Sequence, residues 1–144
     1  MKLTISDIFN LVIGRTTNTI NRSLQRGFKS INLTITHEQW TLLSALWDKD
    51  GQTQQMLSER TFRDKTSVTR LINKLEDQNL VVRIPDKNDQ RNKLIYLTNK
   101  GKSLKEKTEP ILTQTYEKAI HGISEADILT CKKVLNQVFE NLKD

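Results

Sequence analysis

The chain of 144 residues is long enough for one domain with a hydrophobic core, and its 28% charged and 35% hydrophobic residues favour a folded soluble protein over a disordered one. The formal net charge of +6 favours an anionic partner, either nucleic acid or an anionic membrane surface, although solubility alone would also explain it. The single cysteine, Cys131, excludes an intramolecular disulfide framework, and no segment approaches the roughly 20 apolar residues that span a bilayer, so we expect a cytoplasmic protein with no membrane partner.

Helices are predicted for the first third of the chain. An apolar stripe with a period of 3 or 4 predicts a long helix from about Ser6 to Lys29; its members are Ile5, Ile8, Phe9, Val12, Thr16, Ile20, Leu24, Phe28 and Ile31. A second helix is expected to begin after Thr36, because Thr36 and Gln39 have the spacing of a capping box. Gly51 is the strongest signal for its end.

A short helix from Thr53 and a break around residues 61–63 lead to the segment DKTSVTRLINKLEDQN. Its residues Val68, Leu71, Ile72 and Leu75 follow the i, i+3, i+4, i+7 spacing of an amphipathic helix. Asp64 is the expected N-cap, and Asn79 the expected end, because Asn tolerates the left-handed conformation well.

The segments LVVRIP and KLIYLT, residues 80–85 and 93–98, predict two strands around the polar tip DKNDQRN, and this hairpin must pack on helices because two strands alone are marginal. Thr98 begins a long helix, in which we expect a bend at Pro110, and Ser124 begins the last helix. The predicted fold is therefore mainly α with a small β-wing.

The order of three short helices followed by a hairpin is that of a winged helix-turn-helix, whose recognition helix enters the DNA major groove with its N-terminal residues near base edges. Short donors and acceptors are suited to those first turns, and Thr66, Ser67 and Thr69 are such residues. Arg70 is long enough to reach either a guanine edge or a phosphate. The segment is therefore a candidate recognition helix.

The distribution of charge supports this interpretation. Residues 60–93 contain nine basic and five acidic side chains, a net charge of +4, so most of the excess charge lies in about a quarter of the chain. A solvated surface would explain single lysines but not the whole set. The predicted DNA-binding residues are Lys65, Thr66, Ser67, Thr69, Arg70, Asn73, Lys74, Lys87 and Arg91.

The segment from Thr53 to Gly101 resembles the core of the MarR family of bacterial winged helix-turn-helix transcriptional regulators. The matching features are TQQMLSER, DKTSVTRLINKLE, the L-V-x-R entry to the wing, the D-x-R of Asp89 and Arg91, and the L-T-x-x-G that ends at Gly101. The resemblance implies a dimerisation region at residues 1–33 and 99–144 and a DNA-binding domain at residues 34–98. It also implies a homodimer on a pseudo-palindromic double-stranded DNA operator, acting as a repressor that a small molecule releases.

The resemblance also implies roles for particular residues. Arg91, at the wing tip, matches an arginine that enters the minor groove, and Asp89 would brace Arg91 or Arg83, because a carboxylate beside phosphates is repelled. Two positions depart from the family, which commonly has Gly where Asn79 and Phe62 stand. Neither departure removes an expected DNA contact.

Regulators that resemble this family often bind a small anionic or aromatic molecule between the dimer helices and the winged domain. Arg15, His37 and Trp40 are the candidates for such an effector site, because a cation and an aromatic face suit a ring that carries a carboxylate. The alternatives are that Trp40 belongs to the core and that His37 is a solvated residue of a first helical turn.

Other chemistry has less support. Cys131 is in phase with Ile128 and Leu135 on an apolar stripe, which favours a buried small hydrophobic residue over a redox switch. His37 and His121 are far apart in sequence and have no ligand cluster, so we expect no metal and no cofactor. The sequence has no Gly-rich phosphate loop, no nucleophile elbow, and no His/Asp/Glu or Cys/His grouping at a useful spacing, so an enzyme is not expected unless remote residues converge in space. The alternative function is a non-catalytic helical protein–protein interaction module.

Overall fold

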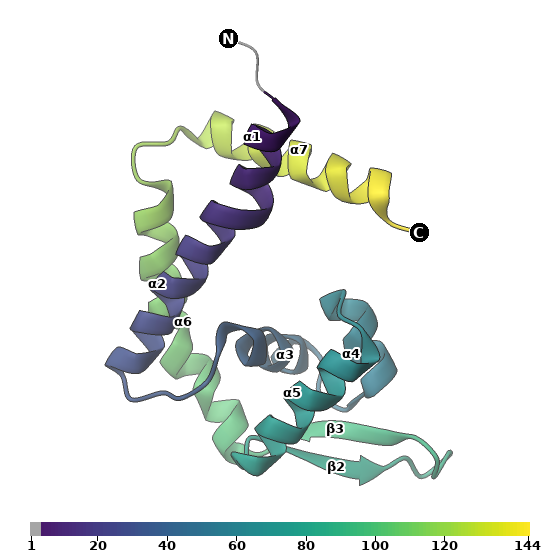
Figure 1. Cartoon of the computed structure of the whole chain (residues 1–144). Coiled ribbons are helices and arrows are strands. Elements are labelled where there is room, and N and C mark those ends of the chain that lie inside the picture. Colours follow the sequence, from purple (N-terminus) through teal and green to yellow (C-terminus); the bar gives the residue numbers. More distant parts are fainter. Residues whose placement is uncertain (1–3) are drawn as a thin grey trace.

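A computed structural model of the protein describes residues 4–144, apart from the side chains of Ile8, Leu11 and Val12. Its elements form two tiers that α6 connects (Figure 1). The helical tier contains α1 (Ile5–Phe9), the π-helix η1 (Asn10–Arg15), α2 (Thr16–Ser30), the second half of α6 (Asn99–Ile120) and α7 (Glu125–Leu142). The winged tier contains α3 (His37–Asp48), α4 (Gln54–Thr61), α5 (Lys65–Asp77) and the strands β1 (Gln52–Thr53), β2 (Val81–Pro85) and β3 (Lys93–Leu97). The predicted mainly α fold with a small β-wing is confirmed.

The first predicted helix is present, but its middle is a π-helix. Helical segments follow one another without a gap from Ile5 to Ser30, and η1 lies between α1 and α2. The stripe of apolar residues predicted one continuous α-helix, because periodicity alone does not reveal a local change to i→i+5 hydrogen bonding. Of that stripe, Leu24 and Phe28 are buried and the first half is exposed at Ile5, Phe9 and Ile20, while Ile8 and Val12 lie outside the described side chains.

The predicted helix starts are confirmed by their caps. The hydroxyl of Thr36 accepts from the backbone N–H of Gln39 at 3.1 Å, and the Gln39 side chain accepts from the N–H of Thr36 at 2.9 Å. Such reciprocal bonds satisfy two donors that the helix itself leaves unpaired. Side chains of Thr53, Asp64, Thr98 and Ser124 cap α4, α5, α6 and α7 in the same position.

Two helix ends test the predicted stop signals differently. Asn79 adopts a left-handed φ of 59°, with its N–H bonded to the Glu76 carbonyl and the Leu80 N–H bonded to the Leu75 carbonyl, each at 2.9 Å. These bonds form a Schellman motif, as predicted. By contrast, α3 ends at Asp48, and Gly51 uses its positive φ of 71° in the following turn into β1.

The wing is a three-stranded antiparallel sheet with the order β1-β3-β2. The hairpin pairs Val81 with Leu97 and Pro85 with Lys93, while Gln52 of β1 pairs with Ile95. Strand β1 was not predicted, because a strand of two residues shows no alternation. This third strand pairs with β3 at one edge of the sheet and helps to stabilise the hairpin.

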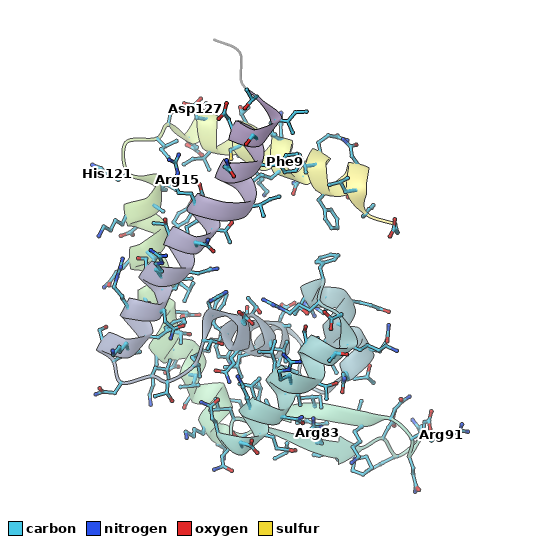
Figure 2. The ribbon with its side chains drawn as sticks, in the orientation of Figure 1. Phe9, Arg15, Arg83, Arg91, His121 and Asp127 are labelled. Atoms are coloured by element: carbon cyan, nitrogen blue, oxygen red, sulfur yellow. The ribbon has the colours of Figure 1, made fainter. Side chains whose placement is uncertain are left out.

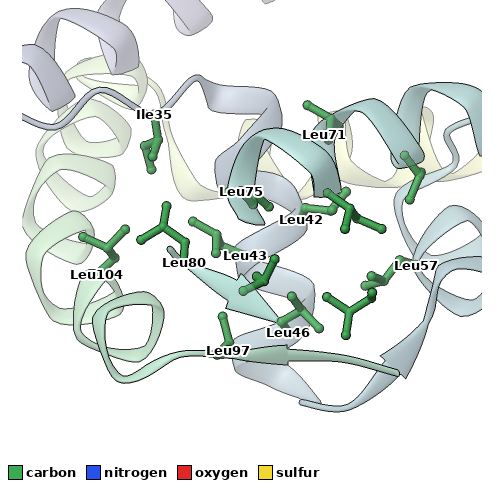
Figure 3. Close-up of a cluster of buried hydrophobic side chains, with 14 of the residues drawn as sticks. Ile35, Leu42, Leu43, Leu46, Leu57, Leu71, Leu75, Leu80, Leu97 and Leu104 are labelled. Carbon is green, nitrogen blue, oxygen red and sulfur yellow. The ribbon is translucent and has the colours of Figure 1, made fainter. Parts of the chain in front are cut away.

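Most of the core lies in the winged tier (Figure 3), and Leu24 and Phe28 of α2 join it from the helical tier. Leucines of α3, α4 and α5 meet residues from the sheet and from the start of α6. Each fully buried aliphatic side chain contributes about 1.5–3 kcal/mol relative to exposure, so this cluster holds the recognition helix against its support. The cluster consists of Leu24, Phe28, Ile35, Leu42, Leu43, Leu46, Leu57, Val68, Leu71, Ile72, Leu75, Leu80, Val81, Ile95, Leu97 and Leu104.

Helix α6 joins the two tiers through a close contact at its start. A Cβ atom at Gly101 would lie 2.1 Å from the carbonyl oxygen of Leu80, and the indole of Trp47 donates to the Gly101 carbonyl at 2.9 Å. The helix continues through Pro110, and the bend expected there stays a prediction. Within residues 4–144, no helix combines the length and apolar character needed to cross a membrane.

The predicted burial of Cys131 is wrong for this chain, because Cys131 is exposed. Every side chain of α7 is exposed except that of half-buried Ile128. The apolar stripe of α7 was correctly identified, but a stripe does not specify its partner. Its large exposed members include Leu129, Leu135 and Phe139.

Candidate nucleic-acid interface

Burial of the inner face of α5 leaves its opposite face in solvent. Val68, Leu71, Ile72 and Leu75 point into the core. Thr66, Arg70 and Lys74 are exposed as a consequence of the helical period. Among the residues that the structure describes, neither Arg70 nor Lys74 has an acidic partner for its side chain, so both charges are available to an outside anion.

The N-cap of α5 engages one of the predicted contact residues. The Asp64 carboxylate accepts from the Ser67 backbone N–H at 2.8 Å and from the Ser67 hydroxyl at 3.0 Å. The backbone bond first, and the hydroxyl bond second, lower the pKa of Asp64 below its ordinary value of 3.8, because both favour the carboxylate. Ser67 therefore acts within the cap and is half-buried, unlike the exposed side chain that we expected.

Thr69 is also turned inward. Its hydroxyl donates to the Lys65 carbonyl at 2.8 Å and accepts from the side-chain nitrogen of Gln54. Gln54 also donates to the Lys65 carbonyl at 3.2 Å, so this residue connects the start of α4 to the first turn of α5. Gln54 was not predicted to take part, because one polar residue in a short helix gives no signal of a partner 15 positions away. Thr66 and Lys65 remain the exposed side chains of this turn.

The wing tip carries two exposed cations, Lys87 and Arg91 (Figure 2 labels Arg91). The predicted bracing by Asp89 takes another form: its carboxylate accepts from the Arg91 backbone N–H at 3.1 Å and from the Asn92 side chain at 3.3 Å. The Asn92 N–H donates to the Asp89 carbonyl at 3.0 Å. Asp89 thus orders the backbone of the tip and leaves the Arg91 guanidinium free, since no described residue pairs with it.

Arg83 joins the wing to α5 instead of pairing with Asp89. Its guanidinium donates to Glu76 at 2.7 Å and to the Asn73 side-chain oxygen at 2.6 Å. Asn73 was predicted to contact DNA, but its oxygen is already an acceptor within the protein. Only its amide nitrogen remains available as a donor.

A groove of about 340 Å³ lies between the N-termini of α4 and α5 and the wing. Four cations line it, namely Lys65, Arg83, Arg91 and Lys93. A concave surface with one sign of charge concentrates the electrostatic potential, and a negatively charged backbone is the complementary ligand. The groove therefore connects the recognition helix and the wing tip into one basic surface.

A second region lies on the side of α3 that faces α4 and α6. Two adjoining cavities of about 560 and 360 Å³ share Trp40, Ser44, Trp47 and Lys105. The indoles of Trp40 and Trp47 meet edge to face, with centroids 6.4 Å apart, and Trp40 donates to the Thr108 hydroxyl at 3.3 Å. Arg60 and Arg63 line the larger cavity. We name this region the tryptophan cavity.

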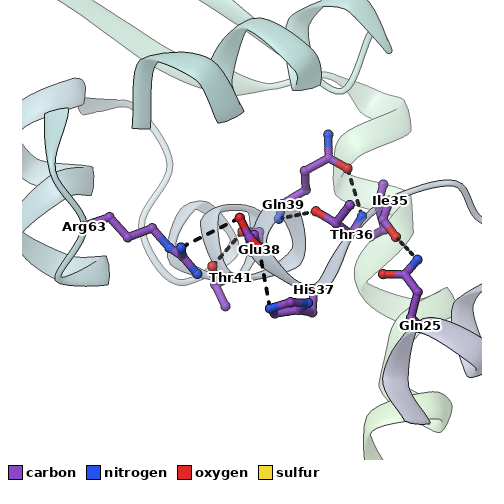
Figure 4. A network of polar contacts seen from close by, with 8 residues as sticks. All are labelled: Gln25, Ile35, Thr36, His37, Glu38, Gln39, Thr41 and Arg63. Carbon is purple, nitrogen blue, oxygen red and sulfur yellow. Dashed lines mark hydrogen bonds and ion pairs between the residues drawn. The ribbon is translucent and has the colours of Figure 1, made fainter. Parts of the chain in front are cut away.

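Only one of the three effector candidates lines the tryptophan cavity. Trp40 does so, but Arg15 lies in the helical tier (Figure 2) and is not among its lining residues. His37 faces Glu38, with Nε2 3.9 Å from Oε1, and Arg63 approaches the other oxygen of Glu38 at 3.9 Å (Figure 4). Arg15, His37 and Trp40 therefore do not form one site in this chain.

Four further residues line this cavity that were not predicted from the sequence, namely Trp47, Arg60, Arg63 and Lys105. The spacing of seven between the tryptophans would have placed both on one helical face, but nothing local shows that α4 and α6 bring cations to that face. In the part of the chain that the structure describes, no three His, Cys, Asp or Glu side chains gather as a metal site.

A helix-turn-helix supported by a core, a following wing and unpaired cations on both elements define a DNA-binding protein of the winged-helix class. The sequence model of the MarR family matches residues 35–93, which include α3, α4, α5, β2 and the wing tip up to the start of β3. SarZ of Staphylococcus saprophyticus, an HTH-type transcriptional regulator, is 31% identical over 108 residues, 74% of each chain. The protein therefore belongs to the MarR family, and the relatives that it matches are transcriptional regulators.

Other known proteins agree with this assignment. The organic hydroperoxide resistance transcriptional regulator of Bacillus subtilis is 31% identical over 93 residues, so the match spans only 63% of that relative and 63% of this chain. The S. aureus MepR–DNA complex superposes with a TM-score of 0.84 and 25% identity over 98% of this chain and 100% of that one. The organohalide-sensing regulator RdhR, bound to 2,4-dichlorophenol, has a TM-score of 0.88 at 18% identity over 98% of this chain and 83% of that one, a likeness of fold.

Proposed function

We propose that the protein is a homodimeric repressor that binds a pseudo-palindromic operator and leaves it when a small anionic or aromatic molecule binds. Residues 34–98 form the DNA-binding domain, and residues 1–33 and 99–144 form the dimerisation region. The observation that carries the DNA-binding assignment is the basic groove between the start of α5 and the wing tip, lined by Lys65 and Arg91, together with the exposed Arg70 on α5. Thr66 and Lys74 on α5 and Lys87 on the wing extend it.

The homodimer is supported by apolar side chains that one chain leaves uncovered in the helical tier. Ile5, Phe9 and Ile13 are 75%, 52% and 65% exposed, and Leu142 at the end of α7 is 74% exposed. Burial of about 25 cal/mol per Å² of apolar surface favours a second copy as the cover, and a two-fold axis places two recognition helices on one face of DNA. Sedimentation equilibrium at micromolar concentration should give twice the chain mass. A monomer under those conditions would contradict the dimer.

The DNA-binding proposal is tested by selection from a random duplex library, followed by footprinting of the bound fragment. We expect enrichment of two inverted half-sites, whose centres lie about one helical turn apart. Placing the selected site over a promoter should then lower reporter expression, whereas higher expression would indicate an activator. If no sequence is enriched above the starting library, the alternative of a protein–protein interaction module gains support.

The tryptophan cavity is the proposed effector site. The indoles of Trp40 and Trp47 and three cations suit an aromatic ring that carries a negative charge. Lys105 is one of these cations; Arg60 pairs with Asp48 and Arg63 approaches Glu38, so an anionic ligand would compete with those carboxylates. Arg63 is adjacent to the Asp64 cap of α5, so a ligand that binds Arg63 would act on the start of the recognition helix. The 2,4-dichlorophenol in RdhR supports the use of a phenol as one probe.

Benzoate and 2,4-dichlorophenol should quench the tryptophan fluorescence in a saturable way and release the selected DNA. The double change Arg60→Gln and Arg63→Gln should weaken benzoate more than the phenol, because only benzoate is fully ionised at pH 7. Arg26→Gln, on the exposed face of α2, is the matched control. Release of DNA with unchanged tryptophan fluorescence would assign the effector to another site.

A further inference from the structure

Phe62 occupies an unusual position in the turn between α4 and α5. Its backbone is left-handed, with φ 53° and ψ 38°, and its side chain is 76% exposed. An aromatic L-residue rarely adopts this conformation, which glycine adopts without a Cβ clash. A backbone of this kind persists only where its surroundings determine it, so the contacts of Phe62 matter.

The described contact of the Phe62 ring is with the far end of α7. The rings of Phe62 and Phe139 meet edge to face, with centroids 4.9 Å apart and an interplanar angle of 73°. Lys143 lies over the Phe139 ring, with Nζ 5.9 Å from the centroid, and pairs with Glu140 at 2.6 Å, so Phe139 also has a contact at its own end of the chain. This contact directly connects the C-terminal helix to the helix-turn-helix.

The position of Phe62 makes the contact relevant to α5. The cap of α5, Asp64, is two residues further on, and the Arg63 N–H donates to the Ser58 carbonyl at 3.2 Å. Only Arg63 therefore separates Phe62 from the cap of α5, and its N–H bond ties the turn to α4. The neighbours Thr61 and Arg63 line the tryptophan cavity, so the turn lies between that cavity and α7.

We propose that Phe62 is a positioning residue, which docks on Phe139 of α7 and thereby sets the placement of the recognition helix relative to the helical tier. This inference rests on the proposed function, because the placement matters only to a dimer that reads two half-sites. Through this contact, the packing of α7 determines the distance between the two recognition helices of the dimer. A ligand in the tryptophan cavity would act on the same turn from its other side.

The test uses three variants that remove the contact between the rings: Phe139→Ala, Phe62→Ala and Phe62→Gly. Two conservative variants retain an apolar contact: Phe139→Leu and Phe62→Tyr. The selected operator and versions with one base pair inserted or deleted between the half-sites serve as probes. Wild type should bind the altered spacings more weakly than the selected one. The affinity for the selected spacing divided by the affinity for an altered spacing should fall about three- to tenfold in the first three variants, as expected for the loss of one aromatic pair. The two conservative variants should keep the wild-type value of this ratio.

Phe62→Gly separates positioning from folding, because it relieves the left-handed strain while it removes the ring. Its thermal midpoint should equal or exceed that of wild type, although its discrimination between spacings falls. Lys133→Ala, exposed on α7, should change neither quantity. If Phe139→Ala and Phe62→Gly keep the wild-type ratio between spacings, the inference is overturned even though the protein binds DNA.

Amide hydrogen exchange of residues 61–65 provides a test that needs no DNA. In the dimer, or in whichever oligomer sedimentation shows, Phe139→Ala should speed exchange there by about three- to tenfold relative to wild type and to Lys133→Ala. Unchanged exchange in Phe139→Ala would overturn the inference. Failure to select any DNA sequence would instead overturn the proposed function, and the exchange experiment would still decide whether the contact holds the turn.

Discussion

Arg83 on the wing and Glu76 on α5 form an ion pair, with Nη1 2.7 Å from Oε1. The Arg83 side chain is 20% exposed and that of Glu76 42%, so water only partly screens the pair. Because Asn73 accepts from the same guanidinium at 2.6 Å, Arg83 holds the wing at a fixed place beside the recognition helix. DNA that contacts both elements would meet a preformed surface.

Arg83→Ala should lower the free energy of unfolding by about 1 kcal/mol, because it removes two charge-assisted hydrogen bonds that are partly screened. Urea denaturation measures this change. Arg60→Ala is the matched control: its pair with Asp48 is more exposed, at 39% and 69%, and should cost less than about 0.5 kcal/mol. If the two variants lose the same free energy of unfolding, the Arg83 bridge to α5 stabilises the fold no more than an exposed ion pair does.

Gly101→Ala should destabilise the protein by about 2–3 kcal/mol, because the added Cβ would lie 2.1 Å from the Leu80 carbonyl oxygen, a backbone atom that cannot rotate away. Thermal or urea unfolding checks this value. At Gly14 a Cβ atom would meet nothing within 4 Å, so Gly14→Ala should leave the stability unchanged or raise it. A Gly101→Ala variant as stable as Gly14→Ala would mean that α6 does not pack so closely on Leu80.

Substitutions at Asn79 should follow the left-handed φ of 59°. Asn79→Gly should maintain the free energy of unfolding or raise it by up to about 1 kcal/mol, whereas Asn79→Ala should lower it by about 1 kcal/mol. Asn136→Ala, in the exposed face of α7, controls for the loss of the amide alone. If Ala and Gly at position 79 were equally stable, the Schellman end of α5 would not depend on this conformation.

The cap of α5 should make stability depend on pH in the acid range. The hydrogen bonds from Ser67 lower the pKa of Asp64 in the folded state below 3.8, so the carboxylate favours the folded state at pH values above 3.8. That contribution is lost as the pH falls below 3.8 and through the folded-state pKa. The stability difference between wild type and Asp64→Ala, followed by urea titration at each pH, should therefore shrink with acid. A difference that grows towards low pH would have the wrong sign.

Local signals explain why the helix starts were predictable. Each cap bonds to a residue three positions further on, so both members of the bond lie in one short segment of sequence. The caps are Thr36, which bonds to Gln39, and likewise Asp64 and Thr98. The Asn79 end was predictable for the same reason. The short strand β1 and the π-helix η1 were not, because each depends on pairing or strain that leaves no periodic trace.

The site was predictable only in its exposed cations. Arg70 and Arg91 were placed correctly on the solvent side of α5 and at the wing tip, because periodicity and the hairpin determine those positions. The sequence could not show that Arg83 would donate to Glu76 and Asn73, or that Gln54 would donate to the Thr69 hydroxyl. Those partners meet only after the helices and strands pack together. The tryptophan cavity was missed because α3, α4 and α6 each contribute to it.

Fluorescence anisotropy with the selected operator, over a range of salt concentrations, tests most directly whether α5 and the wing bind DNA. We expect Arg70→Ala and Arg91→Ala each to weaken DNA binding. If the arginine contacts a base, the affinity should fall by about five- to 150-fold. If it contacts a phosphate, the slope of log K against log salt should become shallower by about 0.9. Arg26→Ala should match wild type in both respects. If Arg70→Ala and Arg91→Ala also match wild type in affinity and in slope, the basic surface is not the DNA-binding site.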